Sequence, residues 1–380
     1  MELREKDVQL IEEKGISLGE FKNQLQTFKN TFPTLKIIQP ATIEKGIQKP
    51  GLHLSAEYEK QMNNLKITKF VPASGAASRM FKELSGFLQG EINEISGNIA
   101  RFFNNIERFA FYSDLQQIIA KKQQTTIKDL IRTNQYKSVV EYLLTENGLN
   151  YGNLPKGLLK FHKYPDSPRT PFEEHLVEGA GYAASGGEVS IHFTVSPEHR
   201  SDFDALSRKV LPGYEKMLNV RFNISWSEQK SSTDTIAVDV ENNPFRNSDG
   251  SLLFRPGGHG ALLENLNDLD ADIIFIKNID NVVPDHLKPD TITCKKLIAG
   301  ALIHTRDKLF RYLHILDEEE NPADALIEEM VSFLREDLCT EIHGMNERQK
   351  QEKISLLRQK FNRPVRVCGM VKNEGEPGGG

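Results

Sequence analysis

The chain has 380 residues, of which 38% are hydrophobic and 27% are charged, and its formal net charge is −5. This length is ample for a sizeable core in one large domain or in two or three domains. The mild acidity excludes the strongly basic surface with which proteins hold nucleic acid or an anionic membrane. The sequence has neither the apolar segment of a signal peptide nor a run long enough to span a bilayer. We therefore expect a cytoplasmic protein with no nucleic-acid or membrane partner.

The three cysteines, Cys294, Cys339 and Cys368, are far apart in the sequence and form no C-x-x-C pair. This spacing favours reduced thiols, buried or partly buried, over a disulfide framework or a metal site.

The first segment, residues 1–65, is predicted to be a helical hairpin followed by a lead-in to the main domain. Apolar residues at helical spacing indicate a helix over residues 2–14, which Gly15 closes. Ser17 and Glu20 fit the capping box of a second helix. We expect this hairpin to pack on the main domain.

Residues 66–83 predict the first strand of an α/β domain and a loop of small residues that turns into a helix. The strand covers residues 67–73, and the loop covers residues 74–80. Such a junction directs backbone N–H groups and the positive end of a helix dipole toward an anion. The pattern indicates a phosphate site, although small residues after a strand are also common in ordinary turns.

Residues 84–150 carry several apolar stripes at helical spacing and predict a small helical insertion. Its aromatic residues are more typical of a core than of a base-stacking platform. Because the insertion lies between two candidate site motifs, we hypothesise that it overhangs the site.

Residues 151–293 are predicted to complete the α/β domain. A capped helix begins at Thr170, strands cover residues 189–196 and 220–227, and a helix separates the two strands. Strands that alternate with helices indicate a mostly parallel mixed sheet with helices on both faces, whose ligands collect at the carboxyl ends of the strands. We expect structural or surface roles for three histidines without ligand spacing: His175, His192 and His199.

A second glycine-rich loop, residues 256–260, precedes an apolar strand that begins at Ile273 and is expected to end at Asp280. A carboxylate at the end of a strand can hold Mg²⁺ together with phosphate oxygens. Asp268, Asp270 and Asp272 offer a rival D-x-D pattern, but they lie before the strand and fit a solvated turn.

Residues 294–380 are predicted to be mostly helical. Helices are expected over about 297–315, 321–339 and 346–361, with a strand candidate at 365–368. The sequence stops in a loop-like stretch at residues 376–380, which we interpret as a truncation.

The motifs at residues 71–80, 155–159 and 255–281 resemble, in this order, the signatures of the UDP-sugar pyrophosphorylases. The resemblance implies a nucleotide-diphospho-sugar transferase-like fold, and within that superfamily the chain looks closest to a bacterial family of unknown function. Two departures stand out. Ser74 and Ala77 replace glycines of the first loop, and the Pro-Lys-Gly motif around Lys156 comes only after the insertion. The nucleotide-binding positions that the resemblance implies are Ser74, Gly75, Ser78, Gln229, Gly257, Gly258, His259 and Gly260.

The activity that the resemblance implies is nucleotidyl transfer from UTP to a sugar 1-phosphate, with release of pyrophosphate. Arg79 and Lys156 would neutralise phosphate charge, Asp280 would hold Mg²⁺, and Asn278 and Asn281 would face the sugar phosphate. Two alternatives remain open: a glycosyltransferase that uses a nucleotide sugar, and a protein that binds a nucleotide or nucleotide sugar without catalysis. The sequence leaves the sugar and the oligomeric state open.

Overall fold

The computed structural model describes residues 3–30, 34, 40–44, 46–340, 342, 344–345 and 347–371, without the side chain of His259. The chain divides into two compact units. Unit 1 comprises Met1–Thr34 and Asn64–Lys288, and unit 2 comprises Leu35–Asn63 and Pro289–Gly380. The finer five-part division made from the sequence stays a prediction.

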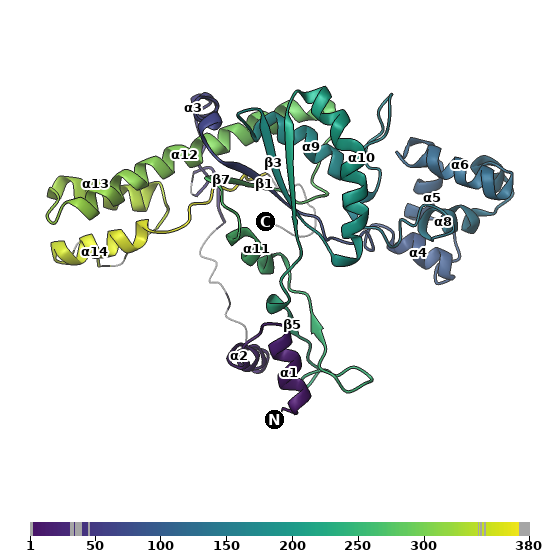
Figure 1. Ribbon diagram of the computed structural model, residues 1–380, viewed down its shortest axis with the longest axis horizontal. Helices are drawn as coiled ribbons and strands as arrows, with labels where there is room; N and C mark the ends of the chain where they lie inside the picture. The colour runs from purple at the N-terminus through teal and green to yellow at the C-terminus, as the bar shows by residue number, and fades with distance from the viewer. Residues whose placement is uncertain are drawn as a thin grey trace. The chain divides into compact units, whose positions relative to one another are not determined.

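A mixed, mostly parallel sheet forms the centre of unit 1 (Figure 1). Its parallel strands are β1 (Ile67–Pro72), β3 (Glu188–Thr194), β4 (Arg221–Ser227) and β7 (Ile273–Ile276), in the order β4-β3-β1-β7. The short β2 (Ala184–Ser185) pairs antiparallel with the start of β3. The predicted α/β class with a mixed sheet is therefore confirmed. The order of the parallel strands reverses between β1 and β7, which is where open α/β sheets form a crevice at their carboxyl edge.

Two helices, α9 (Pro171–Tyr182) and α10 (Arg200–Leu218), pack on one face of this sheet. A capping box between Thr170 and Glu173 begins α9, as the sequence predicts. The alternating side chains of β3 form the core with these helices, in a cluster that includes Val189, Ile191, Phe193, Phe172, Leu176 and Phe203. On the opposite face the ring of Phe70 stacks on that of His192, with centroids 5.6 Å apart. Coverage of this second face by helices stays a prediction.

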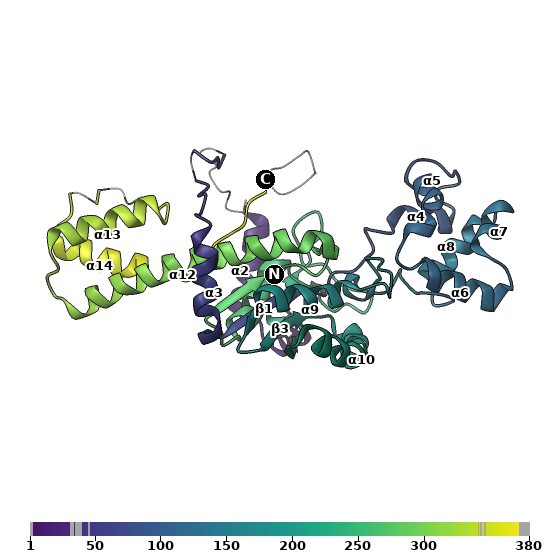
Figure 2. The ribbon, with the colours of Figure 1, turned by 90° about the horizontal axis from the view of Figure 1, so that it is seen from above.

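The insertion is a helical subdomain with a core of its own (Figure 2). Its helices are α4 (Lys82–Gln89), α5 (Gly97–Asn104), α6 (Tyr112–Gln123), α7 (Ile127–Arg132) and α8 (Tyr136–Leu144). Most of the aromatic residues of the insertion lie in this core, as expected. The helix after the first loop begins only at Lys82, because residues 78–81 form a turn.

The amino-terminal hairpin consists of α1 (Glu5–Glu13) and α2 (Leu18–Lys29), and it packs on the strand pair β5 (Thr235–Ile236) and β6 (Phe254–Arg255). Gly15 between the helices has a φ of +73°, a conformation that favours glycine. Ser17 and Glu20 form the predicted capping box. The two helices thus form a hairpin, and it packs on this two-stranded ribbon within unit 1. The remaining helix of unit 1 in the described residues is α11 (Leu263–Asn267).

Unit 2 is helical, with α3 (His53–Gln61), α13 (Asp324–Glu336), α14 (Lys350–Phe361) and nearly all of α12 (Lys288–Glu318). A core cluster joins α12, α13 and α14. Two expectations were wrong here. Residues 365–368 pair with no strand in the described chain, and all three cysteines are exposed instead of buried or partly buried. Among the described residues, no helix has both the length and the apolar composition that a membrane span requires.

Candidate functional site

The loops that follow β1 and β7 meet a turn that contains Lys156. The Nζ atom of Lys156 lies 2.6 Å from Oδ2 of Asp280, and both side chains are partly exposed. The backbone N–H of Lys156 donates to the carbonyl oxygen of Gly75 at 3.1 Å, next to a β-bridge between Ala76 and Pro155. Three motifs that are far apart in the sequence therefore come together at the carboxyl edge of the sheet.

Gly157 permits this close approach. A Cβ atom at this position would lie 2.8 Å from the ring of Phe203 and 3.1 Å from Cγ1 of Ile279. Because Phe203 belongs to the core under α10 and Ile279 precedes Asp280, any side chain here would push the lysine turn away from the loop after β7.

The loop after β1 exposes most of the positions assigned to phosphate binding. Ser74, Gly75, Ser78 and Arg79 are exposed, and a Cβ built on Gly75 would meet no atom within 4 Å. Ala77, which replaces a glycine of the resembled pattern, is 1% exposed and belongs to the core of the helical insertion. Its methyl group is therefore buried and does not fill the space in front of the loop.

The loop after β7 carries Asp280 past the end of the strand. The strand ends at Ile276 and not at Asp280, which corrects the expectation. Residues 277–279 continue beside β1, because Lys277 N–H donates to Phe70 O and Ile279 N–H donates to Pro72 O, both at 3.1 Å. The neighbouring asparagines, Asn278 and Asn281, are exposed on the same loop.

Buried polar side chains of α9 form hydrogen bonds with residues 277–279 of this loop. Nε2–H of His175 donates to the carbonyl oxygens of Asn278 and Ile279, both at 3.2 Å. Nζ of Lys277 donates to both carboxylate oxygens of Glu178, at 2.9 and 2.8 Å, and Nζ of Lys69 lies 3.5 Å from one of them. Burial, followed by the charges of Lys69 and Lys277, holds the pKa of His175 well below its ordinary value, so this imidazole is neutral.

Glu174, the neighbour of His175 on α9, is linked through Lys288 to the segment that follows Asp280. Its buried carboxylate accepts hydrogen bonds from His162 Nδ1, Tyr164 Oη and Lys288 Nζ. Lys288 Nζ also donates to Oδ1 of Asp285 at 2.8 Å. Burial alone would raise the pKa of Glu174, but the three hydrogen bonds outweigh it and lower the pKa below its ordinary value.

These supporting residues were not predicted as part of the site, because charged side chains are usually solvated. A signal was available in α9, where Glu174 and Glu178 lie on one helical stripe, at a spacing of four residues, with the fully buried Tyr182. His175 was assigned a structural or surface role, and the structure gives it a structural one. His192 also has a structural role, since its ring nitrogens lie 2.8 Å from the hydroxyl oxygens of Ser225 and Ser227.

Gln229 and Gly257 form a second group beyond β4. With its amide oriented to match its partners, Gln229 accepts from Gly257 N–H at 2.8 Å and donates to Gly257 O at 3.2 Å. The side chain therefore holds the glycine-rich loop in this structure. Cβ atoms built on Gly258 and Gly260 would meet nothing within 4 Å, so this loop presents open backbone. The side chain of His259 lies outside the described part of the chain.

Asp270 and Asp272 of the rival D-x-D pattern lie at the amino end of the sheet, whereas Asp268 lies near the residues that follow β4. Asp270 pairs with Lys66 at 2.7 Å, Asp272 accepts from Lys66 N–H at 2.8 Å, and Asp268 pairs with Lys230 at 2.7 Å. These carboxylates form the solvated turn that the sequence predicts.

A magnesium ion fits the donor chemistry around Asp280, provided that substrate oxygens complete its coordination. Mg²⁺ usually takes one or two protein carboxylates together with phosphate oxygens and waters. Within the described residues, no three or more His, Cys, Asp or Glu side chains gather as a metal site. The ion would also have to replace the ammonium of Lys156, which now lies against the Asp280 carboxylate.

Comparisons with known proteins identify a family for this chain. Neither the search of curated proteins nor the search of solved structures finds a match. A family model described as a domain of unknown function, DUF4301, matches residues 4–380. Because this match covers almost the whole chain, the protein belongs to the DUF4301 family.

Proposed function

We propose that this protein is a nucleotidyltransferase that joins UTP to a sugar 1-phosphate and releases pyrophosphate. The observation that carries the proposal is the meeting of Gly75, Lys156 and Asp280 beside the point where the strand order reverses. Crevices of this kind are where open α/β sheets bind their ligands. The type of reaction and the choice of uracil as the nucleobase are proposed from the likeness of the three motifs to those of the UDP-sugar pyrophosphorylases.

In the proposed reaction, a phosphate oxygen of the sugar 1-phosphate attacks the α-phosphorus of UTP. The bond from that phosphorus to the bridging oxygen breaks, and the electron pair leaves with pyrophosphate. Lys156 and Arg79 would stabilise the negative charge, and Mg²⁺ held by Asp280 would supply further charge neutralisation when bound. Such transfer is driven by positioning and electrostatics, so the proposal needs no protein nucleophile.

The Lys156–Asp280 contact supports a resting state for this site. Without substrate, the ammonium and the carboxylate neutralise each other. When a triphosphate enters, Lys156 would turn to the phosphate oxygens and free Asp280 for the metal ion. Both groups would thus exchange a protein partner for a substrate partner, which limits the cost of desolvating them.

The test is release of pyrophosphate from UTP in the presence of Mg²⁺ and a panel of sugar 1-phosphates. We expect Lys156→Ala to lower the rate by roughly two to three orders of magnitude, the size of effect seen when one charge-stabilising donor is lost. Asp280→Asn should abolish metal-dependent turnover.

A matched control is available at the other end of the same strands. Lys66 and Asp270 form a pair of similar length, 2.7 Å, beside the amino ends of β1 and β7. Lys66→Ala and Asp270→Asn should leave the rate unchanged. Equal rates for all four variants would refute the assignment of the site.

A non-catalytic nucleotide-binding protein is the second candidate, since Ser74 and Ala77 depart from the glycine pattern. The burial of Ala77 in the helical core weakens this alternative, because its methyl group does not narrow the loop. Binding of UTP without turnover on any acceptor would favour it. Sugar transfer from a nucleotide sugar, without pyrophosphate release, would instead favour the glycosyltransferase.

A further inference from the structure

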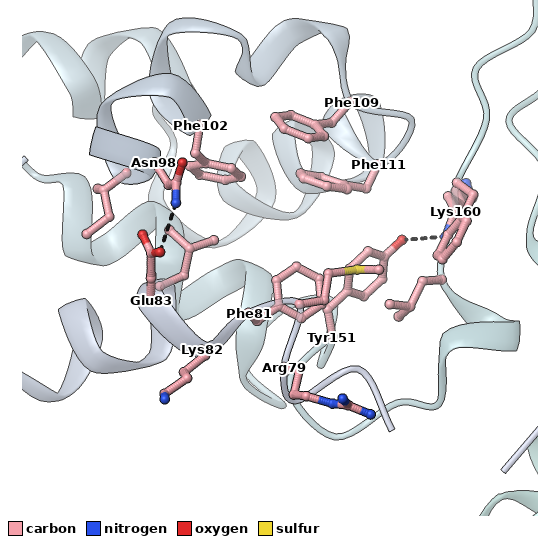
Figure 3. A pocket seen from close by; sticks show the side chains of 15 residues that line it. Arg79, Phe81, Lys82, Glu83, Asn98, Phe102, Phe109, Phe111, Tyr151 and Lys160 are labelled. Atoms are coloured by element: carbon pink, nitrogen blue, oxygen red, sulfur yellow. Dashed lines mark hydrogen bonds between the residues drawn. The ribbon is translucent and has the colours of Figure 1, made fainter. Parts of the chain in front are cut away.

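A cavity of about 600 Å³ lies between the loop after β1, the helical insertion and the segment around Lys160 (Figure 3). This volume is in the range of sites for small organic ligands. The nucleotide motifs account for little of the cavity. They contribute Arg79, Met80 and Leu159 to its lining, and of these only Arg79 is assigned a role in the nucleotide site.

The interior of the cavity is aromatic. Phe109 and Phe111 are stacked with centroids 5.2 Å apart, and Phe102 lies 5.4 Å from Phe109. Tyr151 continues this aromatic lining, with its ring edge-on to Phe111 at 5.6 Å, and Phe81 lies beside Tyr151 (Figure 3). Phe109 remains 38% exposed although its neighbours are core residues. A flat apolar group could cover this ring and bury its remaining surface.

The polar groups in the wall are largely engaged with one another. Nδ2 of Asn98 donates to the carboxylate of Glu83 at 2.8 Å. The hydroxyl oxygen of Tyr151 accepts the N–H of Lys160, whose own ammonium is paired with Asp114. A ligand rich in hydroxyl groups would therefore find few free partners inside, which favours an apolar or aromatic body over a sugar.

Two cations at the rim define the other end of the ligand. Arg79 and Lys82 both line the cavity, and neither side chain forms an ion pair with another described residue. Figure 3 shows their charged ends directed away from the aromatic rings. With Glu83 as the carboxylate of the lining, the cations are in excess, and the mouth favours an anion.

We propose that this cavity binds a small organic anion whose body is apolar or aromatic and whose phosphate or carboxylate group meets Arg79 at the rim. The ligand would place its body against Phe109 and its charged group at the rim. This inference goes beyond the proposed nucleotidyl transfer and does not depend on it.

The experiment titrates the full chain with 1-naphthyl phosphate and follows the fluorescence of the naphthalene ring. Two fragments serve as comparison probes: 1-naphthol, which lacks the anion, and inorganic phosphate, which lacks the apolar body. We expect saturable binding of the whole ligand at one site and binding at least about tenfold weaker for each fragment, the cost of losing one charge-assisted or aromatic contact.

Variants locate the site. Phe109→Ala and Arg79→Gln should each weaken binding of 1-naphthyl phosphate about tenfold. Phe109 is partly exposed and Arg79 is exposed, so neither change should unfold the chain. Matched controls elsewhere in unit 1 are Phe245→Ala, at a ring that is 47% exposed, and Arg208→Gln, at an exposed arginine of α10.

Absence of saturable binding would overturn the proposal, as would binding that Phe109→Ala and Arg79→Gln leave unchanged. The titration contains no nucleotide, so its failure would say nothing against UTP binding. Equally, a failure of UTP to bind would leave the naphthyl phosphate result intact.

Discussion

At the scale of single residues, we expect the pair Lys156–Asp280 to be essential for activity but to contribute little to the stability of the fold. Its side chains are 22% and 36% exposed, and partly exposed ion pairs contribute at most about 1 kcal/mol to folding. We predict that Asp280→Asn changes the free energy of unfolding by less than about 1 kcal/mol while it abolishes metal-dependent release of pyrophosphate. Urea titration measures the first quantity and a coupled pyrophosphate assay the second. A variant that loses activity only because it unfolds would contradict this separation.

His175 should make folding sensitive to acid. Burial lowers its pKa in the folded state, whereas in the unfolded chain its pKa is about 6.5. The unfolded state therefore binds a proton that the folded state refuses, and stability is lost as the pH falls below about 6.5. For one such histidine the loss between about pH 7.5 and about pH 5.5 is about 1 kcal/mol.

The measurement compares urea midpoints at these two pH values for the parent chain, His175→Gln and the control His286→Gln. Glutamine can still donate to the loop carbonyls but does not titrate, so His175→Gln should show a smaller loss on acidification. His286 is exposed, and its replacement should leave the loss of stability on acidification the same as in the parent chain. His192, whose pKa burial also lowers, accounts for part of the acid sensitivity that would remain.

At the scale of elements, Gly157 sets how closely the lysine turn approaches α10 and the loop after β7. Gly157→Ala would place a methyl group 2.8 Å from Phe203, and overpacking of this kind costs about 1–3 kcal/mol. We predict this loss of stability together with reduced turnover, because the Lys156–Asp280 pair must shift. Gly213→Ala is the control, since its Cβ would meet nothing within 4 Å in α10. That change should stabilise the chain by about 0.5–1 kcal/mol. A Gly157→Ala variant as stable as the parent would mean that the turn is looser than the structure indicates.

The sequence predicts an element well where neighbouring residues determine it, and less well where a distant partner does. Local patterns were sufficient for the hairpin around Gly15 and for the capping boxes at Ser17 and Thr170, because each depends on neighbouring residues. The parallel sheet followed instead from the alternation of strands with helices along the chain. The strand candidate at 365–368 was wrong because a strand also needs a partner, which its own sequence does not reveal.

The candidate site was only partly predictable for the same reason. Motif order placed Lys156 and Asp280 in one site, although no local pattern joins residues so far apart. The support from His175, Glu178 and Lys277 was missed, because burial of these polar groups follows from tertiary packing. The cavity beside Arg79 was missed too, since its aromatic residues have the spacing of ordinary core residues.

At the scale of the whole molecule, nucleotide binding should stabilise unit 1. The only tryptophan, Trp226, lies in β4 and stacks on Phe172 of α9, with centroids 5.9 Å apart. Its fluorescence therefore reports on the core beneath the sheet. A ligand present at one hundred times its Kd stabilises the folded state by about 2.7 kcal/mol. We predict that saturating UTP with Mg²⁺ raises the urea midpoint followed by Trp226, and that it does not do so in Lys156→Ala. An equal rise in both chains would place the nucleotide elsewhere.

The most direct test of the central claim is a calorimetric titration of the chain with UTP, with and without Mg²⁺. A parallel titration with ATP tests the preference for the uracil base. The proposed site predicts saturable binding that depends on Mg²⁺, favours UTP and is lost in Lys156→Ala but kept in Lys66→Ala. A folded sample that binds no UTP, or that binds it equally well without the Lys156 ammonium, would contradict the claim.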